Sequence, residues 1–399
     1  MQRLRTRAAA AESYDAVFDQ VENRVRERMR LLEVENERAP KLYEELTAQP
    51  KTDQRRMVRE SPRFWTAALA DLLLEHCRNL FREDLVRAEE VARLALDLVD
   101  RLDPQLYGKG LVNDLTARAW ACFGNVLRIA TDLRGATTAF ANAEANLEDG
   151  SGDLLERALV IDLKVSLLRA QRRFEAALEA SQQVAKIYKR AGDRHLHGRA
   201  LISQAMIHSY AGEPEKAIPL LLQSRDMIDP AREPQLDLMI QNNLLFGLVE
   251  AGRVEEAEAL APEVVRAAAE TSQPERAHCR WNEARLDIVQ GRVEVAESKL
   301  RAVREEFVEQ GHGYNAALVS LDLAKLYLRQ GRTAETRRLA VEMHSIFSSR
   351  DIHREALATL ILFQRAAEQD RCTVHLVEEV IVQLHQVQAG TGVPYERPA

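Results

Sequence analysis

Five short polar side chains recur along this sequence at an almost constant interval. They are Asp162, Ser203, Asn243, Asn282 and Asp322, and the steps between them are 41, 40, 39 and 40 residues. An asparagine carries a donor and an acceptor on one short stem, so it can pair with both the N–H and the C=O of a peptide backbone. The same side chain can also hydrogen-bond a neighbouring helix. The interval therefore indicates either a repeated ligand contact or a repeated structural contact.

Larger side chains at neighbouring positions add a second kind of chemistry. Arginine and lysine bind carboxylates, and aromatic rings anchor apolar groups in recognition sites. The positions expected to lie beside the five polar ones are Arg199, Tyr210, Phe246, Arg285 and Lys325. This set predicts a partner with an acidic or carboxylate-bearing segment, although the formal net charge of the chain is -7.

Motifs of catalysis and of metal binding are missing from the sequence. It contains no Gly-x-x-x-x-Gly-Lys-Ser/Thr, no His-Glu-x-x-His and no Gly-x-Ser-x-Gly. His195 and His197 are two residues apart and would point to different sides of a helix, which suits a metal poorly. We therefore expect no enzyme activity, no cofactor and no metal.

The elements that position these side chains follow from a second regularity. Four glycines lie 40, 39 and 40 residues apart, each between two amphipathic helical patterns: Gly212, Gly252, Gly291 and Gly331. A glycine just past a helix end adopts the left-handed conformation that stops the helix. Five residues after each glycine comes a small side chain that lets two antiparallel helices approach closely: Ala217, Ala257, Ala296 and Thr336. A period of this length predicts a helical repeat array.

One unit of the array resembles the tetratricopeptide repeat. Residues 120–143 follow Trp-x-x-Leu-Gly-x-x-Tyr and then Ala-x-x-x-Phe-x-x-Ala, with Phe123 and Leu127 as substitutions. The resemblance covers about 65–388. It implies an all-α, right-handed solenoid of about seven helix pairs, whose first helices line a concave groove that holds a protein or peptide. In that family, asparagine at the sixth position of the first helix contacts the ligand backbone. Ser203, Asn243, Asn282 and Asp322 occupy this position, and Asp162 does so if the 154–187 repeat has one extra turn residue.

The repeat departs from the family pattern in two ways that bear on function. Its period is near 40 residues rather than 34, which is similar to bacterial peptide-sensing regulators and adaptors. In the 154–187 unit, Gln171-Arg172-Arg173 replaces the glycine turn. The first hypothesis is a non-catalytic scaffold. The alternatives are a peptide-responsive bacterial regulator, or a regulatory subunit of an enzyme or of a transcription factor.

The two ends of the chain differ from the array. Residues 1–63 are expected to form an N-terminal helical region, 64–388 the repeats, and 389–399 a disordered tail. An amphipathic helix over 12–36 should end at Ala39-Pro40. It would either cap the first repeat or make a partner contact, for example in a homodimer.

Composition and charge argue against a disordered chain, a nucleic-acid-binding protein and a membrane or secreted protein. Apolar residues make up 46% and charged residues 29%, which is typical of a folded chain. The negative net charge argues against a nucleic-acid partner. No stretch approaches the ~20 apolar residues that span a bilayer, and the N-terminal apolar run is too short for a signal peptide. The four cysteines are far apart, which suits a reducing compartment, so we expect a cytoplasmic protein with no membrane partner.

Overall fold

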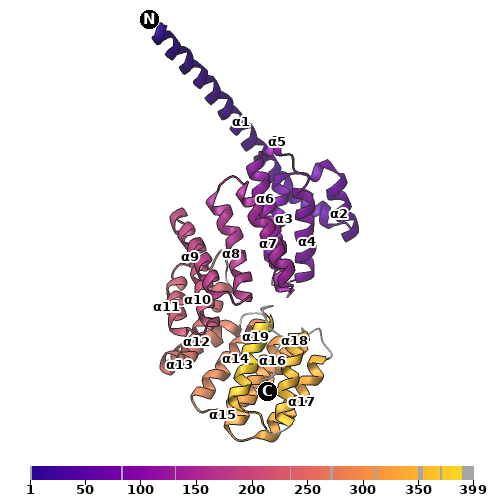
Figure 1. Cartoon of the computed structure of the whole chain (residues 1–399), viewed down its shortest axis with the longest axis vertical. Coiled ribbons are helices and arrows are strands. Elements are labelled where there is room, and N and C mark those ends of the chain that lie inside the picture. The colour runs from indigo at the N-terminus through magenta and orange to yellow at the C-terminus, as the bar shows by residue number, and fades with distance from the viewer. Residues whose placement is uncertain are drawn as a thin grey trace, which may run out of the picture. The chain divides into compact units, whose positions relative to one another are not determined.

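The computed structural model describes the backbone of residues 2–81, 84–130, 132–233, 235–269, 273–310, 312–348, 354–368 and 371–388. Every regular element in these ranges is a helix, which confirms the expected all-α class (Figure 1). None of the helices described is both long and apolar enough to cross a bilayer. The tail expected over 389–399 lies outside the described residues.

The chain divides into two compact units, residues 1–164 and 165–399, with the boundary inside α8 (Leu154–Ala170). Unit 1 contains α1 (Gln2–Thr47), α2 (Lys51–Glu60), a 3-10 turn (Pro62–Phe64), α3 (Ala67–Leu80), α4 (Leu85–Val99), α5 (Pro104–Tyr107), α6 (Lys109–Ile129) and α7 (Leu133–Glu148). Unit 2 contains α9 (Phe174–Ala191), α10 (Arg194–Tyr210), α11 (Pro214–Arg225), α12 (Gln235–Glu250), α13 (Val254–Ala269), α14 (Gln273–Val289), α15 (Val293–Glu309), α16 (Gly313–Arg329), α17 (Thr333–Ser348), α18 (Arg354–Glu368) and α19 (Val374–Gln388). Seven regular helix pairs run from α3/α4 to α16/α17, and α18/α19 is an eighth, irregular pair.

Local signals in the sequence start and stop these helices. The carboxylates of Asp84, Asp132 and Asp193 each accept a backbone N–H three residues later, at 2.8–2.9 Å, at the first turns of α4, α7 and α10. The four repeat glycines end α10, α12, α14 and α16 with φ of 76°, 70°, 74° and 71°. Glycine takes this left-handed conformation without the clash that a Cβ would cause.

Small side chains lie where paired helices approach each other. Ala217, Ala257 and Ala296 are 0% exposed, and Thr336 is 1% exposed. The Thr336 hydroxyl donates to the carbonyl of Arg332 at 3.2 Å, so its polar atom is satisfied inside the core. The close-packing role predicted for these four positions fits their burial.

The N-terminal helix differs from the expectation that it ends at Ala39-Pro40. Helix α1 continues through Pro40 to Thr47. A proline inside a helix removes one backbone hydrogen bond and crowds the preceding turn. Tertiary packing offsets this cost, because Ala39 and Leu46 are buried and the ring of Tyr43 stacks on His76 of α3 at 4.1 Å. The C-terminal half of α1 thus covers the first repeat, whereas Val25 and Met29 are exposed.

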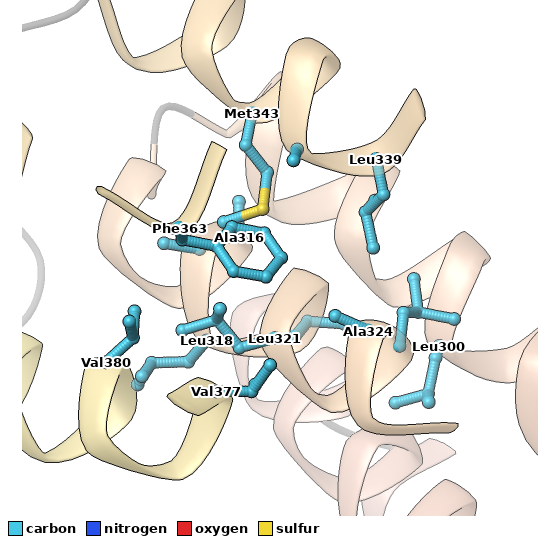
Figure 2. Close-up of a cluster of buried hydrophobic side chains, with 14 of the residues drawn as sticks. Leu300, Ala316, Leu318, Leu321, Ala324, Leu339, Met343, Phe363, Val377 and Val380 are labelled. Carbon is cyan, nitrogen blue, oxygen red and sulfur yellow. The ribbon is translucent and has the colours of Figure 1, made fainter. Parts of the chain in front are cut away.

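The last helix pair packs differently from the other seven. Helix α18 packs against α17, while α19 packs against α16, which is a first helix of the array. Figure 2 shows Val377 and Val380 of α19 beside Leu318 and Leu321 of α16. The second helix of this pair therefore extends the layer formed by first helices.

Candidate functional site

Unit 2 contains a cavity of about 640 Å³ on the layer formed by its first helices. Side chains of α10, α12, α14, α16 and α19 line it, together with one residue of the turn before α9. Seven of the ten residues singled out from the sequence are among the lining residues: Tyr210, Asn243, Phe246, Asn282, Arg285, Asp322 and Lys325. The repeat register thus brings most of the candidate residues into one hollow.

The other three residues do not line this cavity. Asp162 belongs to unit 1, and Ser203 is half-buried on α10. Arg199 Nη1 donates to Glu233 Oε1 at 2.6 Å. Burial raises the pKa of Glu233, but the Arg199 charge and the nearby His195 ring, 3.3 Å away, hold that pKa below its usual value. Arg199 therefore joins α10 to the segment before α12.

Arg285 lines the cavity and makes several contacts with neighbouring side chains. Its Nε donates to Asp322 Oδ2 at 3.0 Å, and Trp281 Nε1 donates to the same oxygen at 2.8 Å. The guanidinium carbon lies 4.5 Å from the centre of the Trp281 ring and 5.1 Å from that of Phe246. These contacts engage Nε and place the guanidinium over two aromatic rings. Its two terminal nitrogens are therefore the part of the group that a bound carboxylate would meet.

The two central asparagines make contacts inside the protein. Asn282 is 8% exposed, and its Nδ2 donates to Asn242 Oδ1 at 2.9 Å and to the Asn242 carbonyl at 3.2 Å. Asn243 Nδ2 donates to the carbonyl of Met239 at 2.8 Å within its own helix. The Asn282 amide joins α14 to α12. Asn282 therefore makes a contact between neighbouring first helices, and the ligand contact expected of it stays a prediction.

Charge in the cavity favours an anion. Its lining holds the cationic side chains of Arg172, Arg285, Lys325 and Arg329, and the carboxylates of Glu250 and Asp322. Lys325 Nζ lies 3.4 Å from Glu378 Oε1 of α19, and Arg329 is exposed. Cations along a half-enclosed wall raise the local concentration of anionic ligands.

Several lining residues were not among the predicted contacts: Arg172, Asn242, His278, Asn315 and Ile381. The register argument selects one residue per first helix, so it omits Asn242, which follows Gln241 and precedes Asn243. His278 contacts the rings of Trp281 and Phe307, with centroids 6.1 and 5.0 Å away. Ile381 could be found only by knowing that α19 packs against α16.

A second hollow, of about 430 Å³, lies among α13, α14 and α15. Four of its charged side chains form one network of ion pairs. Arg292 Nη2 lies 2.6 Å from Asp287 Oδ1, and Lys299 Nζ lies 2.9 Å from Asp287 Oδ2 and 3.1 Å from Glu283 Oε2. These four charges are therefore partly neutralised within the protein. Within the described part of the chain, no group of three or more metal-ligating side chains is assembled.

Comparisons with known proteins agree with this architecture. Residues 155–229 match the family model described as Tetratricopeptide repeat. A crystal structure of a Rap protein complexed with Competence and Sporulation Factor is similar in fold, with a TM-score of 0.61 and 13% sequence identity over 81% of this chain and 88% of that one. No curated protein matches the sequence. At this identity the likeness concerns the fold alone.

Proposed function

We propose that this chain, whose residues 155–229 match the tetratricopeptide-repeat model and whose fold is similar to that of a Rap protein, is a non-catalytic binding protein whose unit 2 holds a segment of another protein or a peptide. The cavity lined by the first helices carries this proposal. It combines a volume of about 640 Å³ with aromatic, cationic and amide side chains. Ligand pockets of this size are usually apolar with a few polar groups that fix orientation.

The chemistry of the lining indicates the kind of segment that fits. The rings of Tyr210, Phe246 and Trp281 line the cavity, and the Arg285 guanidinium lies over two of these rings. A guanidinium fixed before binding loses little side-chain entropy when it takes up a carboxylate. The partner we propose therefore carries an acidic side chain or a C-terminal carboxylate next to an apolar residue.

The site of action that we propose is the cytoplasm. Cys77, Cys122, Cys279 and Cys372 are free thiols. Thiols persist in reducing compartments. Fractionation of cells that produce the protein tests this placement.

Charge-reversal variants test whether the unit 2 cavity binds the partner. Arg329 is exposed and lines the cavity, whereas Arg338 is exposed on α17 and does not. The tagged wild type, Arg329→Glu and Arg338→Glu should be used to capture partners from the native lysate, with quantitative mass spectrometry. We expect Arg329→Glu to lose a partner that Arg338→Glu keeps. Equal capture by all three proteins would place binding outside the cavity.

A peptide-responsive regulator is the second candidate. The fold likeness to a Rap protein that was solved with Competence and Sporulation Factor favours it. Such a protein needs two populated states with different ligand affinity. A ligand-dependent change in hydrogen exchange far from the cavity would support regulation, and protection confined to the cavity would favour a passive scaffold.

A further inference from the structure

The turn between the two helices of a repeat has the same backbone conformation in five successive pairs, from α8/α9 to α16/α17. In four of them the central residue is glycine: Gly212, Gly252, Gly291 and Gly331. In the α8–α9 turn, forty residues before Gly212, the central residue is Arg172 with φ of +53°. It is the one non-glycine residue with positive φ in the described backbone.

Hydrogen bonds show that Arg172 takes the glycine conformation. The N–H of Arg172 donates to the Arg169 carbonyl at 2.9 Å, and the next N–H donates to the Leu168 carbonyl at 2.9 Å. The equivalent bonds at Gly252 run to Val249 at 3.1 Å and, from the following residue, to Leu248 at 2.9 Å. An L-residue with a side chain is disfavoured in this region, because its Cβ crowds the backbone.

The four glycine turns form without a side chain at this position. A Cβ built on any of the four glycines would meet no atom within 4 Å, so the turn leaves open space there. The backbone of the α8–α9 turn could therefore form with glycine in place of Arg172. Strained backbone that the fold does not need is found preferentially at functional sites.

The Arg172 side chain reaches the candidate cavity. It is among the lining residues, together with Ser209 and Tyr210 of α10. Its guanidinium lies over the ring of Phe174 with 4.9 Å between the guanidinium carbon and the ring centroid. Stacking on a ring limits the directions in which the guanidinium can point. Arg172 thus presents an oriented cation where the cavity borders α10, whereas Lys325 and Arg329 come from α16.

We propose that Arg172 is a ligand-contacting residue of the unit 2 cavity, and that it binds a carboxylate of the bound segment. This inference rests on the proposed function of the cavity. In the layer of first helices, α10, α12 and α14 lie between the turn before α9 and α16, so the cationic groups of the turn and of α16 are at different ends of the cavity lining. The ligand would therefore carry one carboxylate for Arg172 and a second anionic group for the α16 cations.

Arg172→Gly separates a role in binding from a role in folding. The substitution restores the residue that the other four turns use, so the folded protein should melt at the same temperature as wild type or higher. It also removes a charge-assisted hydrogen bond to the ligand, which should weaken binding roughly tenfold or more. Arg173→Ala is the matched control, because Arg173 is the exposed neighbour with the same charge and does not line the cavity.

The probe is an equimolar library of random hexapeptides with free carboxyl termini. Peptides that the immobilised wild-type chain enriches would be identified by mass spectrometry and titrated against Arg172→Gly, Arg172→Lys and Arg173→Ala. We expect acidic peptides that Arg172→Gly binds at least tenfold more weakly and that Arg173→Ala binds within twofold of wild type. Arg172→Lys keeps the charge but not the planar fork, so it should lie between wild type and Arg172→Gly.

Three results would overturn the inference. Equal affinity of wild type and Arg172→Gly would remove Arg172 from the site while leaving the proposed cavity in place. A lower melting temperature of Arg172→Gly would assign the arginine to stability of the turn. Enrichment of no peptide by the wild type would contradict the proposed function itself, and the role of Arg172 would fall with it.

Discussion

The carboxylate of Asp322 holds the centre of the cavity together, so its removal should destabilise unit 2 measurably. Asp322 Oδ2 accepts from Trp281 Nε1 at 2.8 Å and from Arg285 Nε at 3.0 Å, and the Asp322 side chain is 13% exposed. A hydrogen bond to a charged group contributes about 1.5–3 kcal/mol, and a buried N–H left without a partner costs about 1–3 kcal/mol.

Trp281 and Arg285 lose different amounts of stabilisation when the Asp322 carboxylate is removed. Trp281 is 6% exposed, so its N–H reaches water less readily than the Arg285 side chain, which is 23% exposed and can turn to solvent. We therefore expect Asp322→Ala to lower the free energy of unfolding by about 2–4 kcal/mol. Asp322→Asn keeps an acceptor for Trp281 and loses the charge that faces Arg285, so it should cost about half as much.

Fluorescence can report this change for unit 2 alone. The chain has three tryptophans, of which Trp65 and Trp120 lie in unit 1 and Trp281 in unit 2. In a background with phenylalanine at positions 65 and 120, urea unfolding followed by emission monitors Trp281. With a slope of about 2 kcal/mol per M, Asp322→Ala should lower the midpoint by about 1–2 M.

Two outcomes would refute this reasoning. A midpoint of Asp322→Ala within about 0.3 M of the parent would show that the carboxylate contributes little. An effect of Asp322→Asn equal to that of Asp322→Ala would show that the acceptor for Trp281 is not the larger contribution. Glu250→Ala is the control, because Glu250 is exposed in the same cavity, and its midpoint should stay within about 0.3 M of the parent.

Three further predictions concern other parts of the chain. Glu35 Oε2 accepts a hydrogen bond from the Ala67 N–H at 3.1 Å, and Glu35 Oε1 accepts one from the Tyr107 hydroxyl at 2.5 Å. Glu35→Ala should therefore lower the free energy of unfolding in urea by about 2–4 kcal/mol and make α1 more sensitive to trypsin. Unchanged unfolding and digestion would contradict this prediction. Burial raises the pKa of Asp97, but hydrogen bonds from two arginines of α2 hold that pKa below its usual value, so the stability that Asp97 adds is present above about pH 4 and is lost as the pH falls further. The difference in free energy of unfolding between wild type and Asp97→Asn should therefore shrink from pH 7 to pH 3. A difference that stays constant over this range would contradict the prediction. Gly252→Ala forces a Cβ into φ of +70° and should lower stability by about 1 kcal/mol, the opposite sign to Arg172→Gly, as measured by thermal unfolding.

The array could be predicted from the sequence because residues within each repeat mark where its helices end and pack. A glycine that ends one helix and a small residue five positions later are local requirements, and the structure contains both at Gly212 and Ala217, and again at Gly252 and Ala257. The same register placed Asn243, Asn282 and Asp322 in one cavity, because equivalent positions of stacked helices face the same way.

Features that depend on packing between distant residues could not be predicted in this way. The continuation of α1 past Pro40 depends on burial of Ala39 and Leu46 against helices that come later in the chain. The contribution of Ile381 to the cavity depends on α19 packing against α16. The register also could not tell that Arg199 would pair with Glu233, thirty-four residues further on.

Site-specific photo-crosslinking in cells tests the central claim, which is that the unit 2 cavity binds a protein or peptide segment. A photoreactive phenylalanine analogue should replace either Tyr210, which lines the cavity and is 46% exposed, or Val341, which is 48% exposed on α17 and does not line it. The account predicts a covalent adduct with a partner from position 210 and none from position 341. Adducts from position 341 without any from position 210 would contradict it.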